Sequence, residues 1–176
     1  MTIENRIRSV IRDIPDFPKP GILFKDITPV LMDPVLCNDI ADAFYSHFND
    51  RRVDAIVGVE SRGFLFGMLL AQKFGVPFVP VRKKGKLPAE TLSYEYSLEY
   101  GTATVEIHKD ALASGAHVLI HDDLLATGGT AAAAAELVSQ LNASVIGFAF
   151  LVGLEFLMGN KVLEKHSDSI YSIVTY

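Results

Sequence analysis

The stretch with the clearest chemical pattern combines two adjacent carboxylates with a loop of small residues. Asp122 and Asp123 follow an apolar run, and the next segment consists of Leu124, Leu125, Ala126, Thr127, Gly128, Gly129 and Thr130. At the carboxyl end of a buried strand, backbone amides and the N-terminus of a following helix converge and favour an anion such as a phosphate. Glycines let the backbone approach the ligand, and threonine hydroxyls add donors. The segment predicts a phosphate-binding loop.

The acidic pair needs a partner other than the phosphate, because two carboxylates repel it. Ribose hydroxyls, with or without Mg²⁺, complement the acceptor oxygens of Asp122 and Asp123. No lysine follows the two glycines and Gly-x-Gly-x-x-Gly is absent, so neither common nucleotide fingerprint applies. The pattern therefore predicts a sugar phosphate as ligand. The alternative for a bare Thr-Gly-Gly-Thr is a solvated acidic turn with a glycine-containing helix start.

A second loop of the same kind follows another apolar run. Glu60, Ser61, Arg62 and Gly63 lie between a predicted strand and a predicted helix, so the amides there and the Arg62 guanidinium suit a second anion. Taken alone, Arg62 is more typical of an ordinary arginine at a helix start. The presence of a second phosphate site in the same fold makes anion binding the preferred interpretation of Arg62.

A basic loop precedes a segment that we interpret as a lid. Arg82 and Lys86 flank or belong to this loop, which contains glycine and proline, and the chain then becomes polar and rich in aromatic residues. The pattern predicts a hairpin with strands at Glu95–Tyr100 and Thr102–Ile107 about Gly101. A long insertion of this kind is typical of a lid or of a disordered excursion, and a solvated basic loop fits its other lysines equally well.

Short apolar runs alternate with helical segments after residue 53, which predicts the element order that must position these loops. Continuous apolar strands separated by helices indicate a parallel sheet covered on both faces, an α/β doubly wound core. The predicted helices are Phe64–Phe74 and Gly129–Leu141. The predicted strands are Val53–Val59, Pro77–Val81, Ala116–His121 and Ser144–Leu151.

The N-terminal part has a different pattern. Apolar residues at helical spacing from Ile3 predict an amphipathic helix that ends near Pro15. The prolines that follow, up to Gly21, predict an ordered extended loop, because proline lacks an amide donor and has a fixed φ. Asp33 and Pro34 then predict the start of a helix that runs to about residue 50.

Length, composition and charge narrow the classes of protein. With 176 residues, 49% hydrophobic residues and a mean hydropathy of +0.28, we expect one domain, 1–176, and no extensive disorder. The longest apolar run, Val145–Leu154, is half the length that a transmembrane helix needs, and a signal peptide is not recognisable, so we expect a soluble cytoplasmic protein. A net charge of −5 argues against nucleic acid as a partner, and the single Cys37 cannot form an internal disulfide.

Four segments, in order, resemble the signatures of the type I phosphoribosyltransferases. Val118–Thr130 (VLIHDDLLATGGT) resembles the phosphoribosyl-diphosphate motif of that family. The other matches are Phe17–Pro29 (FPKPGILFKDITP), Val59–Gly67 (VESRGFLFG), and Gly85–Pro88 (GKLP) with Tyr96–Gly101 (YSLEYG). The similarity covers nearly the whole chain and is closest to the branch that acts on adenine in purine salvage. It implies a parallel twisted sheet with helices on both faces, an N-terminal base-binding segment and a flexible lid.

The resemblance also implies an activity. A transferase of this branch converts adenine and 5-phospho-α-D-ribose 1-diphosphate, here called phosphoribosyl diphosphate, to AMP and diphosphate. Mg²⁺ would be bound mainly through the sugar diphosphate, and the protein would be a homodimer. Ala126–Thr130 would hold the 5-phosphate, and Asp122 and Asp123 the ribose hydroxyls. The diphosphate would be bound by Glu60, Ser61, Arg62, Gly63, Arg82 and Lys86.

The family pattern assigns further residues to the base and to the proton that adenine loses. Leu23, Phe24 and Lys25 match the base-contacting segment, with Phe24 as the stacking partner. Arginine is common at position 25 in the family, and lysine cannot make the planar bidentate contact of an arginine. Glu99 would accept the imidazole proton, and Tyr100 would belong to the lid. Without the resemblance, Glu99 fits a solvent-facing strand residue and Phe24 fits core packing.

Three other functions stay open on the sequence alone: a relative that acts on an oxo-purine, a regulator that senses phosphoribosyl diphosphate, and a general sugar-phosphate module. An oxo-purine site has to donate a hydrogen bond where adenine offers an amino group. A regulator of transcription would need a DNA-binding segment or a basic stripe, and neither is present. The lid and Glu99 argue against a general module. His121 adjoins the acidic pair, but strand alternation directs it away from Asp122 and indicates a packed side chain.

Overall fold

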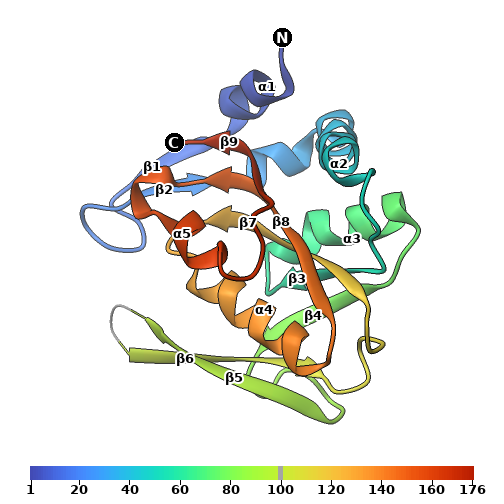
Figure 1. Cartoon of the computed structure of the whole chain (residues 1–176). Helices are drawn as coiled ribbons and strands as arrows, with labels where there is room; N and C mark the ends of the chain where they lie inside the picture. Colours follow the sequence, from blue (N-terminus) through green and yellow to red (C-terminus); the bar gives the residue numbers. More distant parts are fainter. Residues whose placement is uncertain (99–100) are drawn as a thin grey trace.

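The computed structural model describes residues 1–98 and 101–176, and these residues form a seven-stranded sheet with the order β5-β6-β4-β3-β7-β8-β9 (Figure 1). Neighbouring strands from β4 to β9 are parallel, whereas β6 is antiparallel to both β4 and β5. The predicted parallel sheet and the predicted hairpin are thus confirmed, but the first hairpin strand begins at Thr91 instead of Glu95, and Gly101 lies in β6, paired with Leu98. The strands are β3 (Ala55–Val59), β4 (Phe78–Lys83), β5 (Thr91–Leu98), β6 (Gly101–His108), β7 (His117–Leu125), β8 (Ser144–Gly153) and β9 (Ile170–Thr175).

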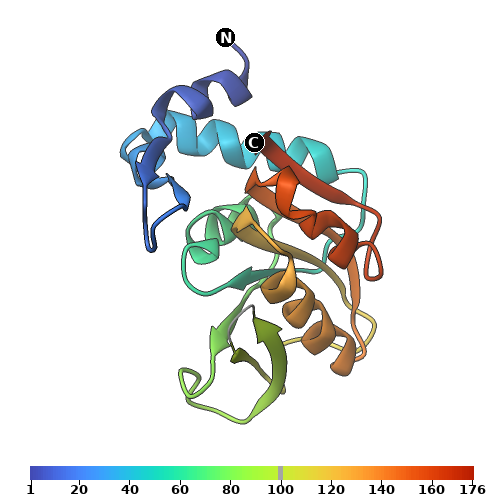
Figure 2. The ribbon, with the colours of Figure 1, turned by 90° about the vertical axis from the view of Figure 1, so that its left-hand side faces the viewer.

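Helices cover both faces of this sheet (Figures 1 and 2). They are α1 (Ile3–Val10), α2 (Pro34–Phe48), α3 (Gly63–Phe74), α4 (Gly129–Gln140) and α5 (Gly159–Leu163), with short 3₁₀ turns η1 (Thr28–Met32) and η2 (Glu155–Leu157). The alanines of α4 are buried in one core cluster with Val118 and Ile120. Phe44 of α2 and Phe66 of α3 form the other cluster with Leu119. Within the described residues, no helix has the length and apolar character needed to cross a membrane.

The strand β7 extends beyond its predicted end. The sequence predicts that the strand stops at His121, with the acidic pair after it, whereas β7 continues to Leu125 because it stays paired with β8 up to Gly153. The acidic pair therefore lies within the strand, and the two carboxylates have the fixed alternation of a strand. The strand β9 and the short helix α5 are not among the elements that the sequence predicts.

The N-terminal helix is shorter than predicted. It ends at Val10, so the predicted helix end near Pro15 is wrong. The residues that follow form β1 (Arg12–Pro15), which pairs antiparallel with β2 (Leu23–Asp26). Ile14 fits the helical spacing, but it lies opposite Phe24 in this two-stranded sheet. Helical periodicity does not encode such a pairing with a later segment. The hairpin β1–β2 is separate from the seven-stranded sheet.

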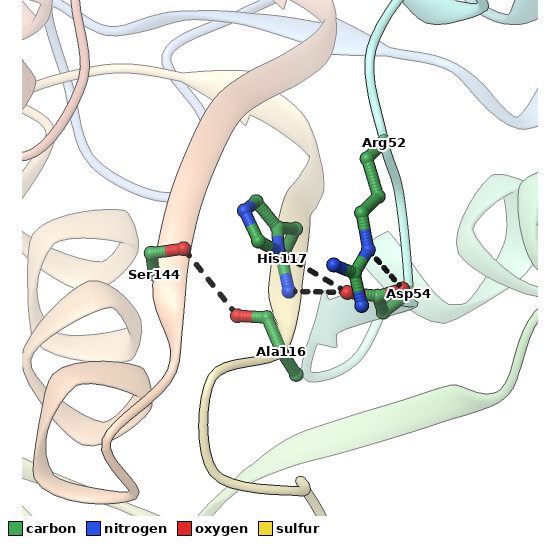
Figure 3. Close-up of polar contacts among 5 residues, drawn as sticks. All are labelled: Arg52, Asp54, Ala116, His117 and Ser144. Carbon is green, nitrogen blue, oxygen red and sulfur yellow. Dashed lines mark hydrogen bonds and ion pairs between the residues drawn. The ribbon is translucent and has the colours of Figure 1, made fainter.

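A polar cluster joins the strands at the amino end of the sheet (Figure 3). Asp54 Oδ2 accepts hydrogen bonds from the His117 backbone N–H, at 2.8 Å, and lies 3.2 Å from His117 Nδ1. Arg52 Nε donates to the other oxygen of Asp54 at 3.0 Å. Ser144 Oγ donates to the Ala116 carbonyl at 3.4 Å. These contacts hold β3, β7 and β8 together at the end opposite to the predicted phosphate loops.

Candidate active site

The two predicted anion loops and the hairpin meet in one cavity at the carboxyl ends of β3 and β7. The cavity has a volume of about 180 Å³. It is lined by Val59, Glu60, Arg62, Lys83, Tyr96, Val105, Asp122, Asp123, Leu124 and Thr130. These strands are parallel neighbours, so their carboxyl ends share one edge of the sheet. Residues far apart in the sequence are thereby brought together as the loop patterns predicted.

The predicted phosphate loop surrounds a smaller hollow of about 70 Å³ next to this cavity, at the N-terminus of α4. Residues 126–130 all line it. Gly128 has φ +84°, and a Cβ added there would lie 2.7 Å from the Gly159 carbonyl oxygen. Both the backbone conformation and the close approach of α5 therefore require glycine at position 128. The first amides of α4 have no carbonyl acceptors within the helix, so this hollow at its N-terminus suits an anion.

The acidic pair is built into the cavity floor with Arg62. Arg62 Nε donates to Asp123 Oδ2 at 2.6 Å, and the Asp123 side chain is only 5% exposed. The Asp123 backbone N–H donates to Asp122 Oδ1 at 2.8 Å. A Cβ on Gly63 would lie 2.9 Å from the same Asp122 oxygen, so this glycine lets α3 approach the pair. The sequence assigned Arg62 and Asp123 to different ligand groups, whereas the structure pairs them with each other.

Burial and the neighbouring Asp123 carboxylate raise the pKa of Asp122 well above its ordinary value. A carboxyl group with a raised pKa holds a proton more readily, which lets it donate as well as accept hydrogen bonds. The two adjacent aspartates therefore have different electrostatic surroundings: Asp123 faces a guanidinium, and Asp122 is partly buried beside a carboxylate. Such a pair can serve a ligand whose hydroxyl groups are both donors and acceptors.

Glu60 orients the beginning of the basic loop. Arg82 Nη2 and Nε donate to its two carboxylate oxygens at 3.2 and 3.3 Å, and the Lys83 backbone N–H donates at 2.8 Å. Burial raises the pKa of Glu60, but the hydrogen bonds from Lys83 and Arg82 outweigh it and lower the pKa overall. Arg82 Nη1 also donates to the Lys86 carbonyl at 3.3 Å. The Glu60 carboxylate is thus bonded to Arg82 and does not face a bound anion as a free negative charge.

The predicted base-binding segment lies in the hairpin β1–β2. Phe24 packs edge to face against Phe17, with ring centroids 5.1 Å apart, and the Arg62 guanidinium lies 5.2 Å from the Phe24 ring centroid. A cavity of about 260 Å³ opens here, lined by Ile14, Phe17, Phe24, Asp26 and Thr28. Contact between Phe24 and Arg62 connects this aromatic cavity with the anion loops. An apolar slot beside charged loops suits a flat heterocycle attached to a sugar phosphate.

Of the other two residues predicted to contact the base, Leu23 is half-exposed and Lys25 is directed elsewhere. The Lys25 ammonium lies 2.6 Å from Asp13 Oδ1 and 3.8 Å from the ring centroid of Tyr176. Alternation along β2 places this side chain on the face opposite to Phe24. The structure does not bring the Lys25 side chain to the aromatic cavity.

Comparison with known proteins places this arrangement in a family. The model of the phosphoribosyl transferase domain family matches residues 30–175. The chain belongs to the phosphoribosyl transferase domain family. It is 54% identical to adenine phosphoribosyltransferase of Thermoanaerobacter pseudethanolicus over 176 residues, which cover 100% of both chains. It is 48% identical over 174 residues to adenine phosphoribosyltransferase of Cytophaga hutchinsonii, with coverage of 99% of this chain and 96% of the relative.

Solved structures agree with this membership. The crystal structure of the Thermoanaerobacter pseudethanolicus enzyme superimposes with a TM-score of 0.95 at 53% identity, covering 99% of this chain and 100% of the other. The Saccharomyces cerevisiae adenine phosphoribosyltransferase, complexed with an imino-altritol bisphosphate and adenine, superimposes with a TM-score of 0.91 at 43% identity. That comparison covers 97% of this chain and 98% of the yeast chain. The type I phosphoribosyltransferase fold is thereby confirmed.

Tyr96, which lines the cavity, and the nearby Glu106, which holds the basic loop, were not predicted from the sequence. Tyr96 Oη is hydrogen-bonded to Thr130 Oγ1 at 3.0 Å, which connects the hairpin to the phosphate loop. Glu106 is buried and accepts hydrogen bonds from the Gly85 N–H, at 2.9 Å, and from Ser93 Oγ, at 3.0 Å. An aromatic residue in the quoted signature was the available signal for Tyr96. Glu106 had no signal, because its partners come from a turn and from the neighbouring strand.

The remaining predictions concern Glu99, Tyr100 and His121. Glu99 and Tyr100 lie outside the described residues. His121 is fully buried, with its ring centroid 5.4 Å from that of Phe44, which confirms the packed interpretation. Burial lowers the pKa of His121 to about 4. In the described part of the chain, no group of three or more His, Cys, Asp or Glu side chains is arranged to hold a metal ion.

Proposed function

We propose that this chain is a purine-salvage transferase that converts adenine and phosphoribosyl diphosphate to AMP and diphosphate. The observation that carries this function is the single cavity in which two anion loops and the acidic pair meet, next to the aromatic cavity at Phe24. The relatives described above are named adenine phosphoribosyltransferase, and their similarity covers nearly the full length of the chain. Both substrates have a matching surface: a charged site for the sugar diphosphate and an aromatic slot for the base.

Each part of the cavity has a role in this proposal. The loop Ala126–Thr130 binds the 5-phosphate with its amides and hydroxyls, and Asp122 and Asp123 bind the ribose hydroxyls. Arg62 donates its Nη groups to oxygens of the diphosphate, because a guanidinium has five N–H donors and only Nε is bonded to Asp123. Arg82, held by Glu60, and Lys86 add positive charge from the basic loop. Ser61 and Gly63 contribute backbone amides.

The chemical step forms the bond between an imidazole nitrogen of adenine and the anomeric carbon, while the bond from that carbon to the diphosphate oxygen breaks. The leaving diphosphate takes the electron pair, and adenine loses its imidazole proton. Because positive charge builds on the sugar and negative charge on the leaving group, the main tasks of the protein are to orient the reactants and stabilise charge.

Mg²⁺ fits this site as an ion carried by the substrate. Mg²⁺ is usually bound through one or two carboxylates and substrate phosphates, with water completing its shell. Asp122 and Asp123 are the carboxylates at the cavity floor, and the described residues provide no larger cage. When bound, the ion neutralises charge on the diphosphate. The contribution of this chain is to place oxygen acceptors beside the ribose and cations beside the leaving group.

Glu99 is the proposed acceptor of the adenine proton, on the basis of the family signature YSLEYG. A positioned base typically contributes about 10²- to 10⁴-fold to a rate. We therefore expect Glu99→Gln to lower kcat by about this factor while the KM for phosphoribosyl diphosphate stays nearly unchanged. Steady-state kinetics of AMP formation measure both quantities. Equal losses in kcat and in affinity for phosphoribosyl diphosphate would contradict a proton role.

A direct assay tests the whole proposal. Purified protein is incubated with Mg²⁺, phosphoribosyl diphosphate and either adenine or hypoxanthine, and nucleotide formation is followed by chromatography. We expect AMP from adenine, little IMP from hypoxanthine, and a loss of activity when Mg²⁺ is omitted. Absence of AMP would refute the proposal, and a preference for hypoxanthine would favour an oxo-purine enzyme. Light scattering of the same sample tests the proposed homodimer.

A further inference from the structure

The ring of Tyr176, which follows β9, contacts two cations from the N-terminal part of the chain. The Lys25 ammonium lies 3.8 Å from its centroid, and the Arg8 guanidinium 4.6 Å. Both distances are well within the range of an attractive cation–π contact. Figure 1 shows the end of β9 next to α1 and the hairpin β1–β2. The ring thus joins three segments that are far apart in the sequence.

The backbone of Tyr176 is fixed to the main sheet. Its N–H donates to the Gly153 carbonyl at 2.9 Å, and its carbonyl accepts from the Glu155 N–H at 2.9 Å. Arg8 also donates to the carbonyl of Thr175 and to Glu4, which restrains the guanidinium on its side of the ring. The aromatic ring is therefore a rigid platform at the edge of the seven-stranded core.

The hairpin β1–β2 needs an anchor of this kind. It is a separate two-stranded sheet, and an isolated hairpin is marginally stable in water. Lys25 is only 9% exposed, and a buried ammonium is costly unless charged or aromatic partners surround it. Its partners are Asp13, which lies opposite Lys25 in the same hairpin, and Tyr176 on the core. Among them, Tyr176 connects the ammonium to the main sheet.

Fixing Lys25 also fixes its neighbour Phe24, whose side chain lies on the opposite face of β2. Phe24 precedes Lys25 on β2, so the two side chains leave the strand in opposite directions. A shift of the hairpin would move Phe24, together with Phe17 in the same hairpin, relative to Arg62 of the diphosphate loop. The phosphate and diphosphate loops lie on other elements, and Arg62 has its own hydrogen bond to Asp123.

We propose that Tyr176 is a positioning residue for the purine site, acting through Lys25 to hold the hairpin that carries Phe24. This inference rests on the proposed function, because it assigns the aromatic cavity to the base. It also gives a role to Lys25 that needs no direct contact with the base. A lysine suits this role, since its ammonium can bind an aromatic face and a carboxylate at the same time.

The test compares Tyr176→Leu with Tyr176→Phe, because phenylalanine keeps the aromatic face and leucine keeps only apolar bulk. Tyr176→Leu removes the ring contacts of both Lys25 and Arg8, and loss of the Lys25 contact alone corresponds to about a three- to thirtyfold change. We expect Tyr176→Leu to raise the KM for adenine by this factor, with the KM for phosphoribosyl diphosphate unchanged within about twofold. Tyr176→Phe should restore parental values. An equal rise in both KM values, or failure of phenylalanine to restore adenine KM, would overturn the inference.

Lys25 provides a second pair of variants. Lys25→Met should reproduce the effect of Tyr176→Leu, and Lys25→Arg should retain most of the adenine affinity because it remains a cation. The double variant Tyr176→Leu with Lys25→Met should be no worse than either single change, since both remove the same contact. Additive losses in adenine affinity would show that the two residues act separately and would contradict the inference.

Hydrogen exchange gives a readout that is independent of activity. In Tyr176→Leu, amides of residues 12–26 should exchange about three- to thirtyfold faster, whereas amides of α4 should keep the parental rate. Faster exchange in both regions would indicate general destabilisation and overturn the positioning role. If the parent protein forms no AMP, the proposed function fails, while selective exchange in the hairpin would still support the anchor.

Discussion

The pair formed by Arg62 and Asp123 connects all parts of the candidate site, and Arg62→Lys tests that geometry most directly. Lysine keeps the positive charge, but it lacks the Nε donor, which lies 2.6 Å from Asp123 Oδ2, and the planar group above the Phe24 ring. The substitution therefore asks whether the shape of the cation matters in addition to its charge. If the proposal is correct, lysine weakens both the resting pair and the binding of diphosphate.

The expected magnitude follows from the contacts that are lost. A hydrogen bond to a charged group contributes about 1.5 to 3 kcal/mol, and a cation–π contact about 0.5 to 1 kcal/mol at an exposed site. Arg62 is 44% exposed and lysine retains part of the attraction, so we take the lower end, about 1 to 2 kcal/mol. For the guanidinium hydrogen bond to the diphosphate, this corresponds to about a 5- to 30-fold rise in the KM for phosphoribosyl diphosphate. For the Asp123 pair, it corresponds to a decrease of about 1 to 2 kcal/mol in the free energy of unfolding.

Kinetics of AMP formation and urea unfolding measure the two effects. Arg52→Lys is a matched control, because Arg52 Nε also donates to an aspartate, Asp54, but at the opposite end of the sheet (Figure 3). We expect the control to leave the KM for phosphoribosyl diphosphate unchanged. If Arg62→Lys has the parental KM, or if the control raises it equally, then the fork geometry of Arg62 does not contribute to binding and the reasoning is refuted.

Three further changes test the loop, the acidic pair and the distal cluster. Gly128→Ala should raise the KM for phosphoribosyl diphosphate by at least about tenfold, because φ +84° and the Gly159 oxygen at 2.7 Å exclude a Cβ, whereas Gly75→Ala, with φ +68° and open space, should lower stability alone. Asp122→Asn should raise the melting temperature at neutral pH: a raised folded-state pKa costs stability above the unfolded value of 3.8, so the gain should shrink as pH falls toward that value, and a gain independent of pH would contradict the assignment. Asp54→Asn should lower the melting temperature at neutral pH with kcat unchanged. The hydrogen bond from the His117 amide is the main cause of the lowered Asp54 pKa, so its contribution is present above pH 3.8 and is lost as pH falls through the lower folded value; a constant difference down to strong acid would refute this.

The local patterns of the sequence predicted the loops well because each loop is a contiguous segment. Thr127 and Gly128 follow the strand β7, and Gly129 and Thr130 begin the helix α4, so strand, loop and helix are adjacent in the chain. Binding of an anion by successive amides is a property of such a segment alone. The order of strands and helices was also predicted, because burial on both faces imposes continuous apolar runs.

Contacts between distant segments were decided only by the tertiary structure. The sequence assigned Asp123 to a sugar and Arg62 to a diphosphate, but whether two side chains 61 residues apart meet depends on the pairing of β3 with β7. The end of α1 depended in the same way on the pairing of β1 with β2. The contact of Lys25 with the ring of Tyr176, which follows β9, likewise joins distant segments. Residue types and spacing determine which chemistry a segment can perform, whereas the partner of each charged group is set by which strands become neighbours, because electrostatic and hydrogen-bond contacts act over only a few ångströms.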